Sequence, residues 1–137
     1  MIKSSYELTV RGYELDSFGH VNNSVYLQYA EAALWHFFKV SGMLSVIQKE
    51  GLFPVIMESS QRYMHELKLL DEVRIDSELT CSSGIVSYKH KIINKTSGLV
   101  SCKVKGKLAY VNKDHIICDI PEAMRSCIEG KNNDNKE

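Results

Sequence analysis

At 137 residues the chain has the length of one domain, enough to bury a core without disulfides or metals. It is 44% hydrophobic and 25% charged, with 17 basic and 17 acidic residues. This balance argues against nucleic-acid binding driven by net charge, although a local basic patch stays possible. We expect a cytoplasmic protein without a membrane span, because the most apolar stretch, residues 25–40, contains Glu31, His36 and Lys39 and the N-terminus lacks a signal-peptide core.

The first half of the chain predicts one strand followed by two helices. Apolar and polar residues alternate over residues 2–10, as in a strand, and a polar loop follows at 12–23. From Ser24 to about Ser41, apolar residues recur at three and four positions, which predicts a helix about 27 Å long. Asn22 and Asn23 are good N-cap residues, Gly42 is a stop signal, and a shorter helix is predicted over 43–49.

The second half predicts four strands in hairpin succession. They cover residues 53–63, which are irregular, and then 73–81, 85–93 and 99–111. A short helix is predicted over 121–128, so the domain covers residues 1–129 and a polar tail covers 130–137. One apolar helix with five strands is most economically arranged as an α+β fold, in which a curved five-stranded antiparallel sheet is wrapped around the long central helix.

The four cysteines do not indicate a metal or disulfide framework. They form no Cys-x-x-Cys pair and have no ligand-like spacing with the five histidines. Cys81 and Cys102 fall on apolar faces of predicted strands, where cysteine is a small core residue. We therefore expect no metal and no redox cofactor.

Asp16 is the candidate catalytic residue. It lies in the loop that leads to the long helix, six residues before Asn22. A helix N-terminus has unpaired N–H groups and partial positive charge, which can hold a developing oxyanion. A carboxylate beside it can attack a carbonyl or activate water, and Gly19 permits close approach of the backbone. The pattern suits acyl transfer, but an Asp here is also typical of a turn or cap.

The motif Asp-x-x-Gly-His-x-Asn-Asn at 16–23, with tyrosines at 26 and 29, resembles the signature of the 4-hydroxybenzoyl-CoA thioesterase-like branch of the hotdog superfamily. The element order resembles that family over about residues 4–125. The resemblance implies a hotdog fold and hydrolysis of an acyl thioester, either acyl-CoA or acyl-acyl-carrier-protein. It also implies that Asp16 is a nucleophile or general base and that the backbone N–H at Asn23 polarises the thioester carbonyl.

Around Asp16, the residues Gly19, His20 and Asn22 are predicted to support the loop. We expect His20 to order the loop by hydrogen bonding rather than to act in catalysis, and Asn22 to cap the helix. Tyr26 and Tyr29 are predicted to line the core or the substrate pocket. Glu31 is too far along the helix to reach the same carbonyl and is predicted to be buried and paired.

Two further groups have both a functional and a simpler interpretation. Glu58 lies in the strand that, in this family, approaches the neighbouring subunit's site, where it would position water or substrate; it is also typical of a solvated strand residue. The three lysines at 103, 105 and 107 would meet the phosphates of coenzyme A or phosphopantetheine, but alternate charges are what any solvent-facing strand shows.

The sequence departs from the family at three positions, and these leave the acyl group open. Leu34 stands where many relatives have Arg, Glu66 where they often have Pro, and Leu70 where they often have Gly. The departures do not involve Asp16.

The resemblance also implies an assembly, because the family's sites form between two subunits. We therefore expect a homodimer or homotetramer, with coenzyme A or phosphopantetheine entering only as part of the substrate. Two alternatives stay open: a non-catalytic hotdog module that binds acyl thioesters or mediates assembly, and a dehydratase of the same superfamily. Dehydratases pair a catalytic His with a carboxylate, a pattern that differs from the motif at 16–23.

Overall fold

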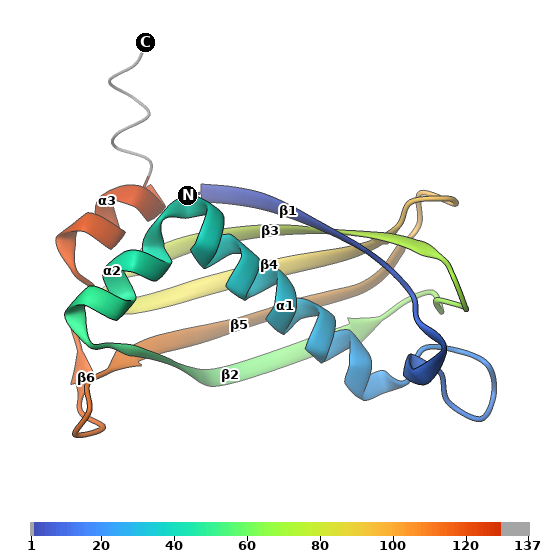
Figure 1. The fold of residues 1–137 in the computed structure, drawn as a ribbon, viewed down its shortest axis with the longest axis horizontal. Coiled ribbons are helices and arrows are strands. Elements are labelled where there is room, and N and C mark those ends of the chain that lie inside the picture. Colours follow the sequence, from blue (N-terminus) through green and yellow to red (C-terminus); the bar gives the residue numbers. More distant parts are fainter. Residues whose placement is uncertain (1, 130–137) are drawn as a thin grey trace, which may run out of the picture.

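The computed structural model describes residues 2–129, and its centre is an antiparallel sheet (Figure 1). The strands β1 (Ile2–Thr9), β3 (Glu72–Ser82), β4 (Ile85–Asn94), β5 (Val100–Val111) and β2 (Phe53–Tyr63) lie side by side in that order. All neighbouring pairs are antiparallel. A two-residue strand, β6 (Ile117–Cys118), pairs with the end of β5 beyond the point where β4 begins. The sequence did not predict β6.

Three α-helices complete the fold. The long helix α1 (Asn23–Ser41) crosses one face of the sheet, while α2 (Met43–Glu50) and α3 (Glu122–Glu129) lie at one end (Figure 1). The Asn22 side chain caps α1 by accepting a hydrogen bond from the Ser24 N–H at 3.0 Å. Gly42, with φ of +83°, ends it in the left-handed conformation, so both predicted helix boundaries are confirmed.

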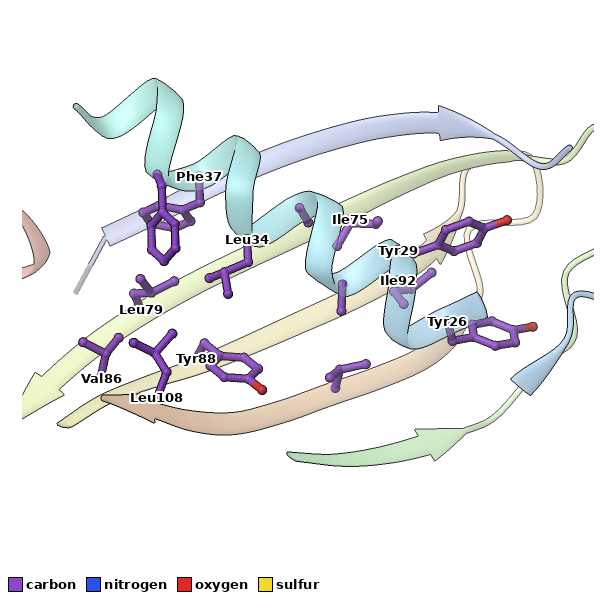
Figure 2. Packing of buried hydrophobic residues seen from close by; sticks show 14 of the residues in the cluster. Tyr26, Tyr29, Leu34, Phe37, Ile75, Leu79, Val86, Tyr88, Ile92 and Leu108 are labelled. Atoms are coloured by element: carbon purple, nitrogen blue, oxygen red, sulfur yellow. The ribbon is translucent and has the colours of Figure 1, made fainter. Parts of the chain in front are cut away.

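The core lies between α1 and the concave face of the sheet. From α1, Tyr26, Tyr29, Leu34 and Phe37 point toward the strands (Figure 2). They meet the alternate, buried side chains of the three central strands, labelled in Figure 2 as Ile75, Leu79, Val86, Tyr88, Ile92 and Leu108. A curved antiparallel sheet around one long helix is the hotdog arrangement, as the sequence predicted.

The irregularity of β2 has a cause in the neighbouring strand. The register between β2 and β5 shifts between Ile56 and Glu58, which marks a β-bulge. Next to the bulge, Ser59 pairs with Gly106, where a Cβ atom would collide with the Glu58 carbonyl oxygen and the Tyr88 ring. Gly106 therefore permits the close approach of β2 that the bulge requires.

One expected burial is wrong. Glu31 is exposed, and its Oε2 accepts a hydrogen bond from the Trp35 indole N–H at 3.0 Å on the outer side of α1. The sheet covers only one side of the helix, so this side, which also carries Leu27, stays accessible in the single chain.

No helix within residues 2–129 is long and apolar enough to cross a membrane. The predicted tail at 130–137 lies outside the described residues.

Candidate active site

Asp16 lies near the tip of a short antiparallel hairpin that leads into α1. At its base the Asn22 N–H donates to the Glu14 carbonyl oxygen at 2.9 Å, and Leu15 and Val21 form a β-bridge. At its tip the Asp16 N–H donates to the His20 carbonyl oxygen at 2.7 Å. Gly19 closes the turn with φ of +84°, a conformation that glycine adopts without strain.

The two carboxylate oxygens of Asp16 have different surroundings. Oδ1 accepts hydrogen bonds from the backbone N–H groups of Phe18 at 2.9 Å and His20 at 3.2 Å, so Asp16 does hold its own turn. Oδ2 makes no hydrogen bond within residues 2–129, and the side chain is half-buried. The turn role therefore occupies one oxygen and leaves the other for a reacting group.

The start of α1 lies close to this carboxylate along the chain. Asp16 and Asn22 are two residue pairs apart in the hairpin, which corresponds to about 7 Å. Asn23 is exposed, and its backbone N–H has no acceptor among the described residues. The Tyr63 hydroxyl donates to the Asn23 carbonyl oxygen at 3.2 Å and ties β2 to the helix start. A free donor at the positive end of a helix dipole can stabilise a developing oxyanion.

Glu14 is a buried anchor beneath the hairpin that sequence reasoning missed. Its Oε1 accepts from the Arg11 N–H at 2.8 Å and the Tyr29 hydroxyl at 2.6 Å. Its Oε2 accepts from the Arg11 guanidinium at 2.9 and 2.7 Å. Burial opposes the charged form, but the hydrogen bonds from Arg11 and Tyr29 outweigh it and hold the pKa of Glu14 below its ordinary value. This network fastens the hairpin to α1.

The segment between β2 and β3 covers the hairpin from the other side. The Val21 N–H donates to the carbonyl oxygen of Leu67, which is fully buried. The Leu67 N–H in turn donates to the Tyr26 hydroxyl at 3.1 Å. Tyr26 is thus a buried residue whose hydroxyl positions this segment, and contact between Tyr26 and substrate stays a prediction.

His20 orders the loop chiefly through its backbone. Its carbonyl oxygen accepts a hydrogen bond from the Asp16 N–H, and its N–H donates to Asp16 Oδ1. Its ring lies 3.7 Å (Nε2 to Oε1) from Glu66, one of the residues that depart from the family. A second departure, Leu70, has φ of +65°, in the left-handed region where relatives carry glycine. That conformation costs a non-glycine residue about 1–2 kcal/mol. Both departures therefore lie in the segment that packs on the loop of Asp16.

Glu58 is not brought to Asp16 within one chain. It follows the β2 bulge on the sheet face away from α1, is exposed, and lies 3.6 Å from the Lys107 ammonium group. Lys103, Lys105 and Lys107 also point to that outer face and are exposed. Within residues 2–129, no group of three or more His, Cys, Asp or Glu side chains is arranged to hold a metal ion.

Comparison with known proteins identifies relatives over most of the chain. Residues 10–128 match the model of the thioesterase-like superfamily. The chain is 26% identical over 122 residues to the acyl-acyl carrier protein thioesterase ATL3 of Arabidopsis thaliana, covering 88% of this chain and 64% of that protein. It is 32% identical over 84 residues to the long-chain acyl-CoA thioesterase FadM of Escherichia coli, covering 59% of this chain and 64% of FadM.

Solved structures share the architecture. The crystal structure of a DHNA-CoA thioesterase from Staphylococcus aureus superposes with a TM-score of 0.84 and covers 99% of this chain and 95% of that one, at 18% identity. At that identity the likeness shows the fold alone. The chain spans less than two thirds of the length of the two curated relatives, 64% in each case.

Proposed function

The chain belongs to the thioesterase-like superfamily, and from this premise we propose that it hydrolyses an acyl thioester to a free acid and a thiol. The observation that carries the proposal is the arrangement at the hairpin. Among the described residues, Asp16 has an Oδ2 without a hydrogen-bond partner, and its hairpin leads directly to the Asn23 N–H, which also has no partner, at the N-terminus of α1. A carboxylate beside a helix start is suited to attack on a carbonyl group.

In the proposed reaction, the thioester carbonyl oxygen accepts a hydrogen bond from the Asn23 N–H. The helix dipole then stabilises the negative charge that develops on this oxygen. Asp16 either attacks the carbonyl carbon directly, giving an anhydride that water opens, or removes a proton from an attacking water. In both routes the carbon–sulfur bond breaks, the thiol leaves, and one water is consumed. No metal or redox cofactor takes part.

The proposal includes a second copy of the chain. β2 forms one edge of the sheet and is 11 residues long. It exposes four apolar side chains, those of Phe53, Val55, Ile56 and Met57. Long apolar edges readily pair with another strand, so we infer that two copies join along β2, as a homodimer or as the unit of a homotetramer. Such pairing would place Glu58, which follows the bulge, at the subunit interface.

The alternative is a module that binds acyl thioesters without cleaving them. Its support is that Asp16 has a complete structural role through Oδ1, which a non-catalytic loop would also need. The two functions differ in whether free thiol is released, and not in whether a thioester binds.

The test follows thiol release from a panel of acyl-CoAs, from short to long chains, and from acyl-carrier-protein thioesters. Both kinds of thioester belong in the panel because the names of the two curated relatives specify one each. We expect hydrolysis of at least one member at a rate well above the uncatalysed background. A protein that binds panel members yet releases no thiol from any of them would support the binding module and contradict hydrolysis.

A further inference from the structure

A strongly basic groove crosses the sheet face opposite α1. Its volume is about 1080 Å³, and it extends from β2 to β1 across all five long strands. Its lining contains six basic and two acidic side chains, although the whole chain has a net charge of zero. We use "basic groove" for its most cationic part, which is formed by Arg62, Lys89, Lys91, Lys103 and Lys105.

The strand register places these charges directly against one another. Lys89 of β4 lies opposite Lys105 of β5, and Lys91 lies opposite Lys103. On the other side of β5, Arg62 of β2 lies opposite Lys103. Like charges at directly opposed positions repel and destabilise a sheet. All five side chains are exposed, and none makes an ion pair within the described part of the chain.

Other basic residues on the same face do have acidic partners. Lys107 pairs with Glu58 at 3.6 Å, and Arg74 pairs with Asp76 at 3.1 Å. Asp76 lies directly opposite Lys91 and Glu78 directly opposite Lys89, so each β4 lysine has an acidic neighbour, although neither pair comes within ion-pair distance. Protection of a sheet edge does not account for the lysines either, because β4 and β5 are interior strands. The two acids offset part of the charge of the β4 lysines, so the excess of positive charge is centred on Arg62, Lys103 and Lys105.

The spacing of the charges limits what can neutralise them. Adjacent strands are about 4.8 Å apart, and successive residues on one face of a strand are about 7 Å apart. The five cations thus occupy an area of about 10 by 7 Å. Lysine and arginine are standard ligands of phosphate oxygens, and an area of this size suits a compact anion with several charges.

We propose that the basic groove binds a polyphosphate group of the kind carried by nucleotides. The sheet separates the groove from α1, so it is a different site from the one at Asp16 in the same chain. The polyphosphate could belong to coenzyme A or to a free nucleotide. The inference stands on the register of the lysines and does not rest on the proposed function.

The test uses two double variants with the same change in net charge. Lys103→Gln/Lys105→Gln removes two β5 lysines that each lie opposite a β4 lysine, whereas Lys39→Gln/Lys95→Gln removes one lysine in the last turn of α1 and one that pairs with Glu7. Thermal unfolding and calorimetric titration are measured with tripolyphosphate, ATP and coenzyme A at constant ionic strength. We expect all three compounds to bind the wild type and to raise its Tm.

The groove variant should be more stable than the wild type without ligand but should bind the ligand more weakly. Without ligand its Tm should rise, because two repulsive cross-strand pairs are gone, while its affinity for tripolyphosphate should fall at least tenfold. The control variant should not gain stability and should keep the wild-type affinity. Equal losses of tripolyphosphate affinity in both variants, or no stabilisation of the wild type by tripolyphosphate, would overturn the assignment.

The comparison of ligands distinguishes the sources. Similar binding of tripolyphosphate, ATP and coenzyme A supports a site for the polyphosphate group itself. Tighter binding of coenzyme A, with the same loss in the groove variant, supports coenzyme A as the source. Binding of coenzyme A alone would contradict the proposal, and so would preference for a single-stranded oligonucleotide or for anionic phosphatidylglycerol vesicles over tripolyphosphate at the same salt concentration.

Discussion

Single side chains hold the hairpin of Asp16 in place, and Glu14 has the largest share of these contacts. The carboxylate accepts four hydrogen bonds from Arg11 and Tyr29 and is only 6% exposed. Glu14 joins Arg11, which precedes the hairpin, to Tyr29 of α1. The loop that carries Asp16 therefore depends on a residue that does no chemistry itself.

Substitution Glu14→Ala should lower the free energy of unfolding by about 2–3 kcal/mol, because it leaves the Tyr29 hydroxyl and part of the Arg11 guanidinium without their partner. Urea unfolding monitored by circular dichroism measures this. Glu7→Ala is the control, since Glu7 forms an exposed ion pair with Lys95 and should change stability by less than about 1 kcal/mol. Similar losses in both variants would show that the Glu14 network does not anchor the hairpin.

A second buried polar pair, Ser77 and His90, joins β3 to β4 under α1. The two side chains are 2.6 Å apart (Oγ to Nδ1), and His90 is 2% exposed. Burial lowers the pKa of His90 to about 4. The unfolded chain, in which the pKa is about 6.5, therefore binds a proton that the folded chain does not bind over this interval.

Stability should consequently fall as the pH is lowered from about 6.5 toward 4, by about 3 kcal/mol from this group. Above pH 6.5 the group contributes no pH dependence, because it is neutral in both states. Urea midpoints of the wild type and His90→Gln, measured across this interval, should converge as the pH falls. Parallel pH curves for the two proteins would mean that His90 titrates normally in the folded state.

Among the elements, β2 is the strand along which we expect two copies of the chain to pair. It is an edge strand with exposed Val55 and a bulge fixed by Gly106 on the neighbouring strand. Pairing of two such edges would continue the sheet from one copy into the next. It would also bury apolar side chains that are accessible in the single chain.

Val55→Lys should convert the oligomer to a monomer and lower thiol release, because a charge on the edge strand opposes pairing. Native mass spectrometry gives the oligomeric state, and circular dichroism shows whether the variant is folded. Val40→Lys, at a more exposed position near the end of α1, should leave both properties unchanged. A wild-type protein that is monomeric and fully active would contradict the shared interface.

Sequence predicted the elements best where their determinants are local. The bounds of α1 follow from Asn22, Gly42 and the periodicity between them, and its start was correct to within one residue. The hairpin at 14–22 was predicted only as part of a polar loop, although its turn residues lie together in the chain. By contrast, the bulge in β2 depends on Gly106, and β6 exists only because β5 extends past β4.

The buried polar contacts that sequence missed join residues that are distant in the chain. Glu14 and Tyr29 are 15 positions apart and Ser77 and His90 are 13 apart, and no periodic pattern relates either pair. The exposure of Glu31 was misjudged because apolar periodicity does not show which part of a helix surface the sheet will cover. Whether Gly19, Asn23 and Glu58 act on substrate stays a prediction.

At the scale of the whole molecule, the two faces of the sheet have separate characters. The concave face is filled by α1 and carries the hairpin with Asp16 at one end (Figure 1). The outer face carries the basic groove, and Arg62 of the edge strand belongs to it. A dimer joined along β2 would set the two grooves, which carry charge of the same sign, next to each other. Added salt should therefore weaken anion binding, because it screens an attraction, and favour assembly, because it screens a repulsion.

The central claim is that Asp16 supplies the carboxylate for thioester hydrolysis, and Asp16→Asn tests it most directly. An asparagine oxygen can still accept the hydrogen bonds from Phe18 and His20, so the turn should survive while the charge is lost. Ser17→Ala, in the same exposed turn, is the matched control.

The measurement is the rate of thiol release from the best substrate of the panel, with unfolding curves to confirm that each variant is folded. We predict that Asp16→Asn lowers kcat at least a hundredfold while remaining folded, because both proposed routes need the carboxylate, and that Ser17→Ala keeps the wild-type rate. A folded Asp16→Asn protein that releases thiol as fast as the wild type would contradict the account.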